Sequence, residues 1–254
     1  MHELRGRAAI VTGASKGIGA ATALELGRLG VAVVLAARTS EAIQAMAETI
    51  ERSGGRAEAI ACDVSRYDDV AAIVAHCKSC FGSVDILVNN AGLIEPIARI
   101  AESDPELWGQ VADVNYKGVY HGLRATIPIM IAQGSGIIVN ISSGAATSAL
   151  EGWSHYCSSK AAVLSLTRCA DKEYREHGIR VVGLSPGTVA TGMQTVIKAS
   201  GVNPVSQLDP SVHIPPEWAA RTVAWLCTED AAEFAGIDFS IKSDESRRRV
   251  GLID

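Results

Sequence analysis

Short apolar runs alternate with helical patterns along most of the 254-residue chain. The run VAVVLA at 31–36 contains no polar position, as expected of a strand that is covered on both faces. Strand–helix alternation favours a parallel sheet with helices on both faces, so we expect a doubly wound α/β fold. Similar apolar runs lie at 8–11, 57–61, 84–88, 136–141 and 179–184, and helical patterns lie at 17–29, 40–53, 67–80, 104–131 (long enough for two helices) and 154–177.

The pattern predicts a single domain over residues 1–254, because no linker or shift in composition divides the chain. Right-handed crossovers bring the carboxyl ends of the strands to one edge of the sheet, where ligands bind. The stretch 188–216 contains Gly, Asn and Pro but little periodicity. We expect it to form a mobile substrate-binding loop at that edge.

Composition narrows the class of protein. Apolar residues make up 48% of the chain and charged residues 20%, which is typical of a soluble globular enzyme. The net charge of −5 offers no attraction to nucleic acid or to an anionic membrane. No stretch has the pattern of a signal peptide or a membrane span, so we expect a cytoplasmic protein that binds a small molecule.

The chain has six cysteines, and two of them, Cys77 and Cys80, form a CxxC pair near the end of the 67–80 helical pattern. Zinc or redox use would give such a pair a function. No second CxxC and no nearby His-x-x-x-His completes a zinc site. We therefore expect buried helical thiols and no metal site.

The first strand is followed by the glycine-rich segment TGASKGIG, residues 12–19, which opens the first helix. Gly13 allows a sharp turn, and Gly17 and Gly19 permit the close approach of a phosphate and tight helix packing. Backbone N–H groups at a helix start favour a pyrophosphate, so this segment predicts a dinucleotide site, although a tight turn alone would need the same glycines. Its predicted contacts are Gly13, Ser15, Lys16, Gly17, Ile18 and Gly19.

Tyr156 and Lys160 are four residues apart in the segment YCSSK, which places both side chains on one face of a helix. A phenol has an ordinary pKa of about 10, and a neighbouring ammonium lowers it. The pair is therefore a candidate acid/base unit, although Tyr and Lys also meet at this spacing by chance.

Several motifs together resemble the short-chain dehydrogenase/reductase family, over roughly residues 5–240. They occur in the family's order, and Ser143 precedes Tyr156 by the thirteen residues that the family pattern implies. The resemblance implies a Rossmann-type, mainly parallel seven-stranded sheet, a nicotinamide cofactor, and hydride transfer between an alcohol and a carbonyl. The motifs are Thr12–Gly19, Asn89–Gly92 (NNAG), Asn115, Ser143, Tyr156-x-x-x-Lys160 and Pro186–Gly187.

The resemblance also implies four catalytic residues. Tyr156 transfers the proton, Ser143 hydrogen-bonds the carbonyl oxygen, and Lys160 lowers the Tyr156 pKa and holds the nicotinamide ribose. Asn115 is expected to anchor a water that links Lys160 to solvent; alternatively, it satisfies a neighbouring backbone group. Ser142 is the alternative to Ser143, since only one of two consecutive residues at a strand end faces the substrate.

Cofactor choice follows from charge at the end of the second strand. NAD-selective sites place a carboxylate there, whereas this chain has Arg38 and no carboxylate before Glu41. Arg38 can bind a 2′-phosphate, and Lys16 adds a second cation, so we expect NADP rather than NAD. A solvated charge is the alternative interpretation of Arg38.

Other cofactor contacts are carried over from the family. Asp63 is expected to accept from the adenine amino group while Val64 packs against the ring, and Asn89 is expected to stabilise the sheet. The remaining implied contacts are Asn90, Ala91, Gly92, Pro186, Gly187, Thr188 and Thr191.

Substrate specificity is expected in the segments 93–100, 144–153 and 188–216, whose apolar side chains favour an uncharged carbonyl or secondary alcohol. A catalytically silent NADP-binding sensor or scaffold is the alternative.

The family's Asp-Gly-Gly after the seventh strand is absent near Lys242–Asp244. This puts in doubt the C-terminal subunit contact of the homo-oligomer, a dimer or tetramer, that the family implies through helix 154–177.

Overall fold

The computed structural model describes residues 2–254 and contains one sheet in which all seven strands are parallel. The spatial order is β3-β2-β1-β4-β5-β6-β7. Strands β1 to β3 are added toward one edge of the sheet and β4 to β7 toward the other, so the strand order reverses between the neighbours β1 and β4. The predicted Rossmann-type fold is confirmed. The strands are β1 (Ala8–Thr12), β2 (Ala32–Ala37), β3 (Arg56–Ala61), β4 (Ile86–Asn89), β5 (Gly136–Ile141), β6 (Ile179–Ser185) and β7 (Asp238–Ser240).

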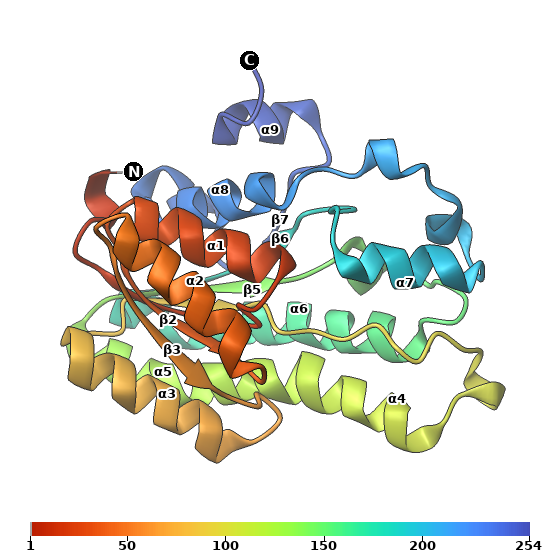
Figure 1. The fold of residues 1–254 in the computed structure, drawn as a ribbon, viewed down its shortest axis with the longest axis horizontal. Helices are drawn as coiled ribbons and strands as arrows, with labels where there is room; N and C mark the ends of the chain where they lie inside the picture. Colours follow the sequence, from red (N-terminus) through yellow and green to blue (C-terminus); the bar gives the residue numbers. More distant parts are fainter. Residues whose placement is uncertain (1) are drawn as a thin grey trace.

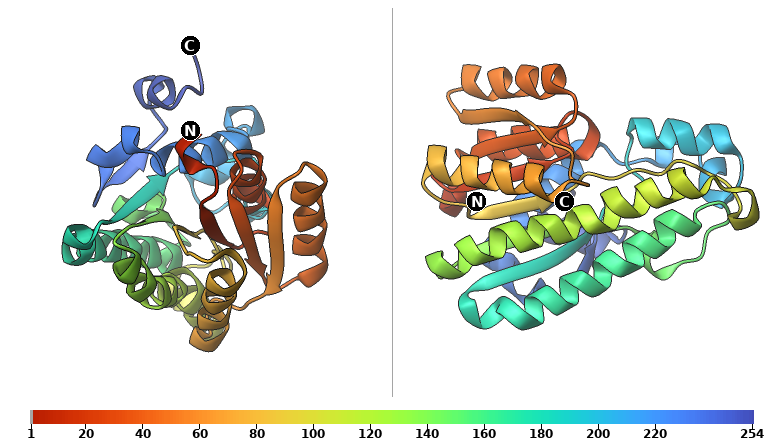
Figure 2. Two further views of the ribbon diagram at one scale, coloured as in Figure 1. Left: turned by 90° about the vertical axis from the view of Figure 1, so that its left-hand side faces the viewer. Right: turned by 90° about the horizontal axis from the view of Figure 1, so that it is seen from below.

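Helices cover both faces of the sheet (Figure 1). On one face lie α1 (Gly17–Arg28), α2 (Ser40–Arg52) and α8 (Pro216–Leu226), and on the other lie α3 (Tyr67–Phe81), α5 (Gly118–Gln133) and α6 (Ser154–Tyr174). The end-on view shows the resulting three layers, with one apolar core on each side of the sheet (Figure 2). The remaining helices are α4 (Pro105–Ala112), α7 (Gly192–Ser200) and α9 (Asp244–Val250).

Local sequence explains where several helices begin and end. The Asp104 carboxylate caps α4 by accepting from the N–H groups of Glu106 and Leu107, and Pro105 occupies the first helical position. Helix α3 ends at Gly82, which has a φ of +82° and so adopts the left-handed conformation that favours glycine.

The 104–131 pattern forms two helices, as its length allowed, but no loop separates them. A π-helical segment, Asp113–Lys117, joins α4 to α5, and the Gly118 N–H donates to the Asp113 carbonyl five residues earlier. The joined helices run side by side with α6 (Figure 2). The extra residue shifts the apolar pattern by one position, about 100°, and the single range 104–131 was too coarse to locate that shift.

The 188–216 stretch is more ordered in secondary structure than its sequence predicted. It contains α7, and its two ends are joined: Ala190 N–H donates to the Ile214 carbonyl at 2.9 Å, and Ile214 N–H donates to the Thr188 carbonyl at 3.0 Å. The segment is therefore a flap with a closed base, standing at the carboxyl edge of the sheet beyond β6.

Candidate active site

The glycine-rich segment after β1 is held against the end of β4. The Asn90 amide donates to the carbonyls of Thr12 and Gly13, and the Thr12 hydroxyl accepts from the N–H groups of Asn90 and Ala91. A Cβ on Gly13 would lie 2.8 Å from the Ala91 Cα, and one on Gly19 would lie 2.4 Å from the Asn90 amide nitrogen. These glycines are therefore required by close packing as well as by the turn.

Two helix N-termini meet beside this segment. Gly17 begins α1 with a φ of +58°, and a Cβ there would lie 3.1 Å from the methyl group of Thr191, the residue that precedes α7. Helix N-termini carry free N–H groups and partial positive charge, so this meeting point can hold a pyrophosphate. Ser15 and Ile18 lie in the same turn, and Pro186, Gly187 and Thr188 lead from β6 to the Thr191 side.

The ends of β2 and β3 bring Arg38 close to Asp63. Partial burial raises the Asp63 pKa, but hydrogen bonds from the Ser65 hydroxyl and N–H, helped by Arg38 and Arg66, hold it below its ordinary value. Val64 is buried beneath the same edge. Within the described residues, neither Lys16 nor Arg38 forms an ion pair, so both exposed cations are available to an anionic ligand.

The two consecutive serines after β5 face opposite ways, as alternation predicts. The Ser142 hydroxyl donates to Asp238 at 3.1 Å, whereas the Ser143 side chain reaches the Tyr156 hydroxyl and lowers the Tyr156 pKa by hydrogen bonding. Ser143 also accepts from the Ala145 N–H at 3.1 Å. The structure thus brings together Ser143 and Tyr156, from segments that are thirteen residues apart.

Lys160 lies one turn beyond Tyr156 on α6, with Nζ 5.6 Å from the centre of the tyrosine ring. The predicted lowering of the Tyr156 pKa was wrong for the protein alone: burial raises it to about 12, and this outweighs the Ser143 hydrogen bond. Burial also lowers the Lys160 pKa to about 8. The spacing argument counted the charge but not the removal of both groups from water.

Asn115 lies in the π-helical segment, where its side chain braces the chain after β4. Its amide oxygen accepts from the Leu93 N–H at 2.7 Å, and its amide nitrogen donates to the Leu93 carbonyl at 2.9 Å and to the Ser159 hydroxyl at 3.3 Å. The alternative interpretation of Asn115, a residue that satisfies neighbouring backbone groups, therefore describes its side chain. Asn89, expected to stabilise the sheet, donates to Asn140 on β5 at 2.9 Å.

A third apolar cluster surrounds Tyr156 at this edge of the sheet. Ring centres of Tyr156 and Trp153 are 5.5 Å apart, and the cluster draws on the three segments predicted to determine specificity. Buried His155 braces one of them, since its Nε2 donates to the Ile94 carbonyl at 2.7 Å. The members from those segments are Ile94, Ile97, Ala145, Leu150, Trp153, Met193, Val196, Ile197 and Val205.

Two residues near the catalytic group escaped sequence analysis. Asp238 on β7 accepts from Ser142 and from Ser185, at 2.8 Å for the latter, and its negative charge partly opposes the lowering of the Lys160 pKa. Lys242 follows β7, and its Nζ lies 2.8 Å from where a Gly144 Cβ would be. An acidic residue at the start of a short strand and a lysine in place of the Asp-Gly-Gly motif were the available signals.

Comparison with known proteins identifies the family. Residues 7–200 match the family model of the short chain dehydrogenases. The chain belongs to this family. Cyclohexanol dehydrogenase from an Acinetobacter species is 31% identical to this short chain dehydrogenase over 243 residues, which are 94% of this chain and 95% of that protein.

Two further relatives agree. A 3-oxoacyl-(acyl-carrier-protein) reductase from a Synechocystis species is 35% identical over 236 residues, covering 92% of this chain and 94% of that one. The crystal structure of NAD⁺-bound xylitol dehydrogenase superimposes with a TM-score of 0.87 at 27% identity, covering 94% of this chain and 98% of that one.

This short chain dehydrogenase is therefore an oxidoreductase that acts on alcohol and ketone substrates with a nicotinamide cofactor. The glycine-rich turn Thr12–Gly19, here called the glycine cradle, fits such a group, because no side chain in the described part of the chain caps the N-terminus of α1 that follows it. Among the described residues, no helix is long and apolar enough to cross a membrane.

Burial of Lys160 predicts a specific dependence of stability on pH. The Lys160 pKa is about 8 in the folded protein against an ordinary 10.5, so between these values the unfolded chain binds more protons and the Lys160 contribution to stability rises with pH. Lys160→Met is expected to remove this rise, measured as the difference from wild type in urea unfolding at several pH values. Lys172→Met, an exposed change on the same helix, should keep the wild-type slope. An unchanged slope in Lys160→Met would contradict the shift.

Proposed function

We propose that this short chain dehydrogenase interconverts a carbonyl and a secondary alcohol with NADP(H), and that Tyr156 is its general acid and base. The observation that carries the proposal is the meeting of Ser143 and Tyr156 beside buried Lys160, at the edge where the glycine cradle lies. A sensor or scaffold would need the cradle but not this group of three.

In the reductive direction, the Ser143 hydroxyl donates a hydrogen bond to the carbonyl oxygen and stabilises the charge that develops on it. Bound NADPH supplies the hydride that reaches the carbonyl carbon. The Tyr156 hydroxyl gives its proton to the oxygen. Since the Tyr156 pKa is about 12, the phenol is fully protonated at neutral pH and ready to act as an acid.

Lys160 then restores the proton of Tyr156. Its pKa of about 8 lies below that of the phenol, so transfer from the ammonium to the phenolate is downhill. The Lys160 Nζ donates to the Ile141 carbonyl at 2.7 Å, which fixes its position beneath the ring. The Asn115 side chain supports the proposed relay by holding Leu93 and the segment after β4 next to α6, and a water beside this residue is proposed to return the proton from solvent to Lys160.

The preference for NADP rests on Arg38 and Lys16. Arg38 follows β2 directly, where an NAD-selective site would carry a carboxylate for the ribose 2′-hydroxyl. Lys16 precedes α1, and both cations are exposed. In this arrangement a 2′-phosphate meets two positive charges, and Asp63 and Val64 remain for the adenine.

The substrate is proposed to be mainly apolar and uncharged next to its reacting carbon. Tyr156 itself belongs to the third apolar cluster, and both Trp153 and Ile197 of that cluster are buried. Cyclic ketones are suitable first substrates, because their ring carbons are apolar and their carbonyl oxygen is the one group that needs a hydrogen bond from Ser143.

Self-association is proposed to use the joined helices α4 and α5 together with α6. The joined helices carry four large apolar side chains that are exposed in the single chain, although exposed apolar residues scattered over a surface are common. Covering them in a dimer or tetramer would remove their contact with water. They are Leu107, Tyr116, Tyr120 and Ile131.

Removing the phenol tests catalysis directly. Tyr156→Phe is expected to lower kcat for ketone reduction by about 10²- to 10⁴-fold, because only the acid/base step is lost, while NADPH affinity stays within a few-fold of wild type. Consumption of NADPH in the presence of a ketone panel measures the first, and fluorescence titration the second.

Tyr174→Phe, at the end of the same helix, is the matched control and should keep wild-type activity. Wild-type protein that binds NADPH but turns over no member of a broad panel would favour the sensor instead.

Charge reversal tests the cofactor. Arg38→Asp combined with Lys16→Ala is expected to raise KM for NADPH at least about tenfold more than KM for NADH, since only NADPH carries the 2′-phosphate that these cations would pair with. Steady-state kinetics with both cofactors give the ratio. Equal losses for the two cofactors would mean that the cations do not select between them.

A further inference from the structure

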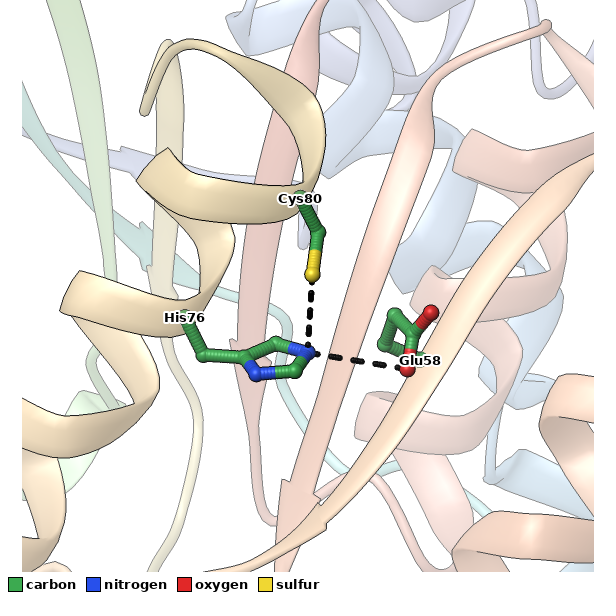
Figure 3. A group of neighbouring side chains, drawn as sticks. All are labelled: Glu58, His76 and Cys80. Carbon is green, nitrogen blue, oxygen red and sulfur yellow. Dashed lines mark hydrogen bonds and ion pairs between the residues drawn. The ribbon is translucent and has the colours of Figure 1, made fainter.

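Three side chains of metal-ligating type converge far from the catalytic edge, between the edge strand β3 and helix α3. They are Glu58 in β3 and His76 and Cys80 in α3 (Figure 3). Cys80 is exposed, contrary to the predicted pair of buried thiols, whereas Cys77 is buried. His76 and Cys80 form a His-x-x-x-Cys pair, whose spacing puts an imidazole and a thiol on one helix face just as His-x-x-x-His would place two imidazoles.

The separations between these groups suit one small metal ion. The His76 Nε2 lies 3.3 Å from the Cys80 Sγ and 3.6 Å from the Glu58 Oε2, and all three ligand atoms lie within 4.8 Å of one another. Ligand atoms about 2.0–2.3 Å from a tetrahedral zinc ion are about 3.3–3.7 Å from one another. Two of the three distances between ligand atoms, His76–Cys80 and His76–Glu58, already lie in this range. The Glu58 side chain, 46% exposed, has the freedom to close the third.

Both elements keep these groups in place. In β3, Glu58 pairs with Val34 of β2, whose side chain belongs to the core on the α3 side of the sheet. In α3, His76 and Cys80 are four residues apart near the C-terminus of the helix. The ligands thus project from two rigid elements toward one point (Figure 3).

The electrostatic setting favours a cation. A thiolate and a carboxylate together carry two negative charges, and the C-terminal end of α3 adds partial negative charge. The nearby Arg56 is occupied elsewhere: its guanidinium donates to the Cys80 carbonyl at 3.2 Å and lies 4.9 Å from the centre of the Phe81 ring. Thiolate and imidazole ligands select zinc over magnesium or calcium.

We propose that Glu58, His76 and Cys80 bind one Zn²⁺ ion, with water as the fourth ligand. Binding displaces the thiol proton of Cys80 and joins the edge strand β3 to α3. The ion would act as a clamp between the edge of the sheet and the helix that covers it. This site is independent of the reaction proposed above, and zinc binding there would contradict the prediction that the chain has no metal site.

A titration with Co²⁺ tests the proposal, because cobalt bound by a thiolate gives a charge-transfer band in the near ultraviolet and tetrahedral cobalt absorbs in the visible. We expect both to saturate at one equivalent of Co²⁺ and to disappear when Zn²⁺ is added. Cys80→Ser should abolish the charge-transfer band and weaken Zn²⁺ binding at least about tenfold. Cys169→Ser removes another exposed thiol and should leave both unchanged.

A chemical readout guards against a variant that folds poorly. In the wild-type protein, Zn²⁺ is expected to slow alkylation of Cys80 but not of Cys169, as seen by mass spectrometry of peptides, and to raise the melting temperature. A wild-type protein without the cobalt–thiolate band would overturn the proposal. So would a Cys80→Ser variant that retains the band, or a Zn²⁺ that protects the two thiols equally.

Discussion

Hydrogen bonds from the Asn90 amide join the end of β4 to the glycine-rich turn after β1, across the point where the sheet changes direction. The joint leaves so little space that a Cβ at Gly13 or Gly19 would overlap its neighbours. The glycine-rich turn leads into the N-terminus of α1. The chain after β4 runs through Gly92 to Leu93, whose N–H donates to Asn115, and Asn115 in turn donates to Ser159 on α6. The glycine-rich turn and Tyr156 are therefore linked through one small region of backbone.

Burial decides the chemistry of the Tyr156–Lys160 pair more than their mutual charge does. Burial removes both side chains from water and so disfavours their charged forms, the phenolate and the ammonium. It therefore raises the pKa of Tyr156 and lowers the pKa of Lys160. The partly buried carboxylate of Asp238 partly counters this for Lys160. The Lys160 ammonium is thereby a stronger acid than the Tyr156 phenol.

Sequence patterns predicted most of the fold because apolar periodicity survives in each strand and helix: α1, α2 and α3 end within a residue of the expected bounds. The order of motifs was enough to place Ser143 beside Tyr156. The pKa of Tyr156 and the exposure of Cys80 depend on how deeply each group is packed by distant segments, and a local spacing carries no such information. Helix α7 was missed because Gly, Asn and Pro around it mask nine helical residues.

The π-helical turn between α4 and α5 sets a limit on how this chain can vary in length. Such a turn holds one residue more than an α-helix would, and each residue rotates a helix by about 100°. Because the turn absorbs that residue, loss of a single residue there would let the two helices fuse into a regular one, but would displace Asn115, whose amide oxygen accepts from the Leu93 N–H at 2.7 Å. A change in length that a surface loop would absorb freely therefore alters, in this segment, which side chain supports the backbone after β4.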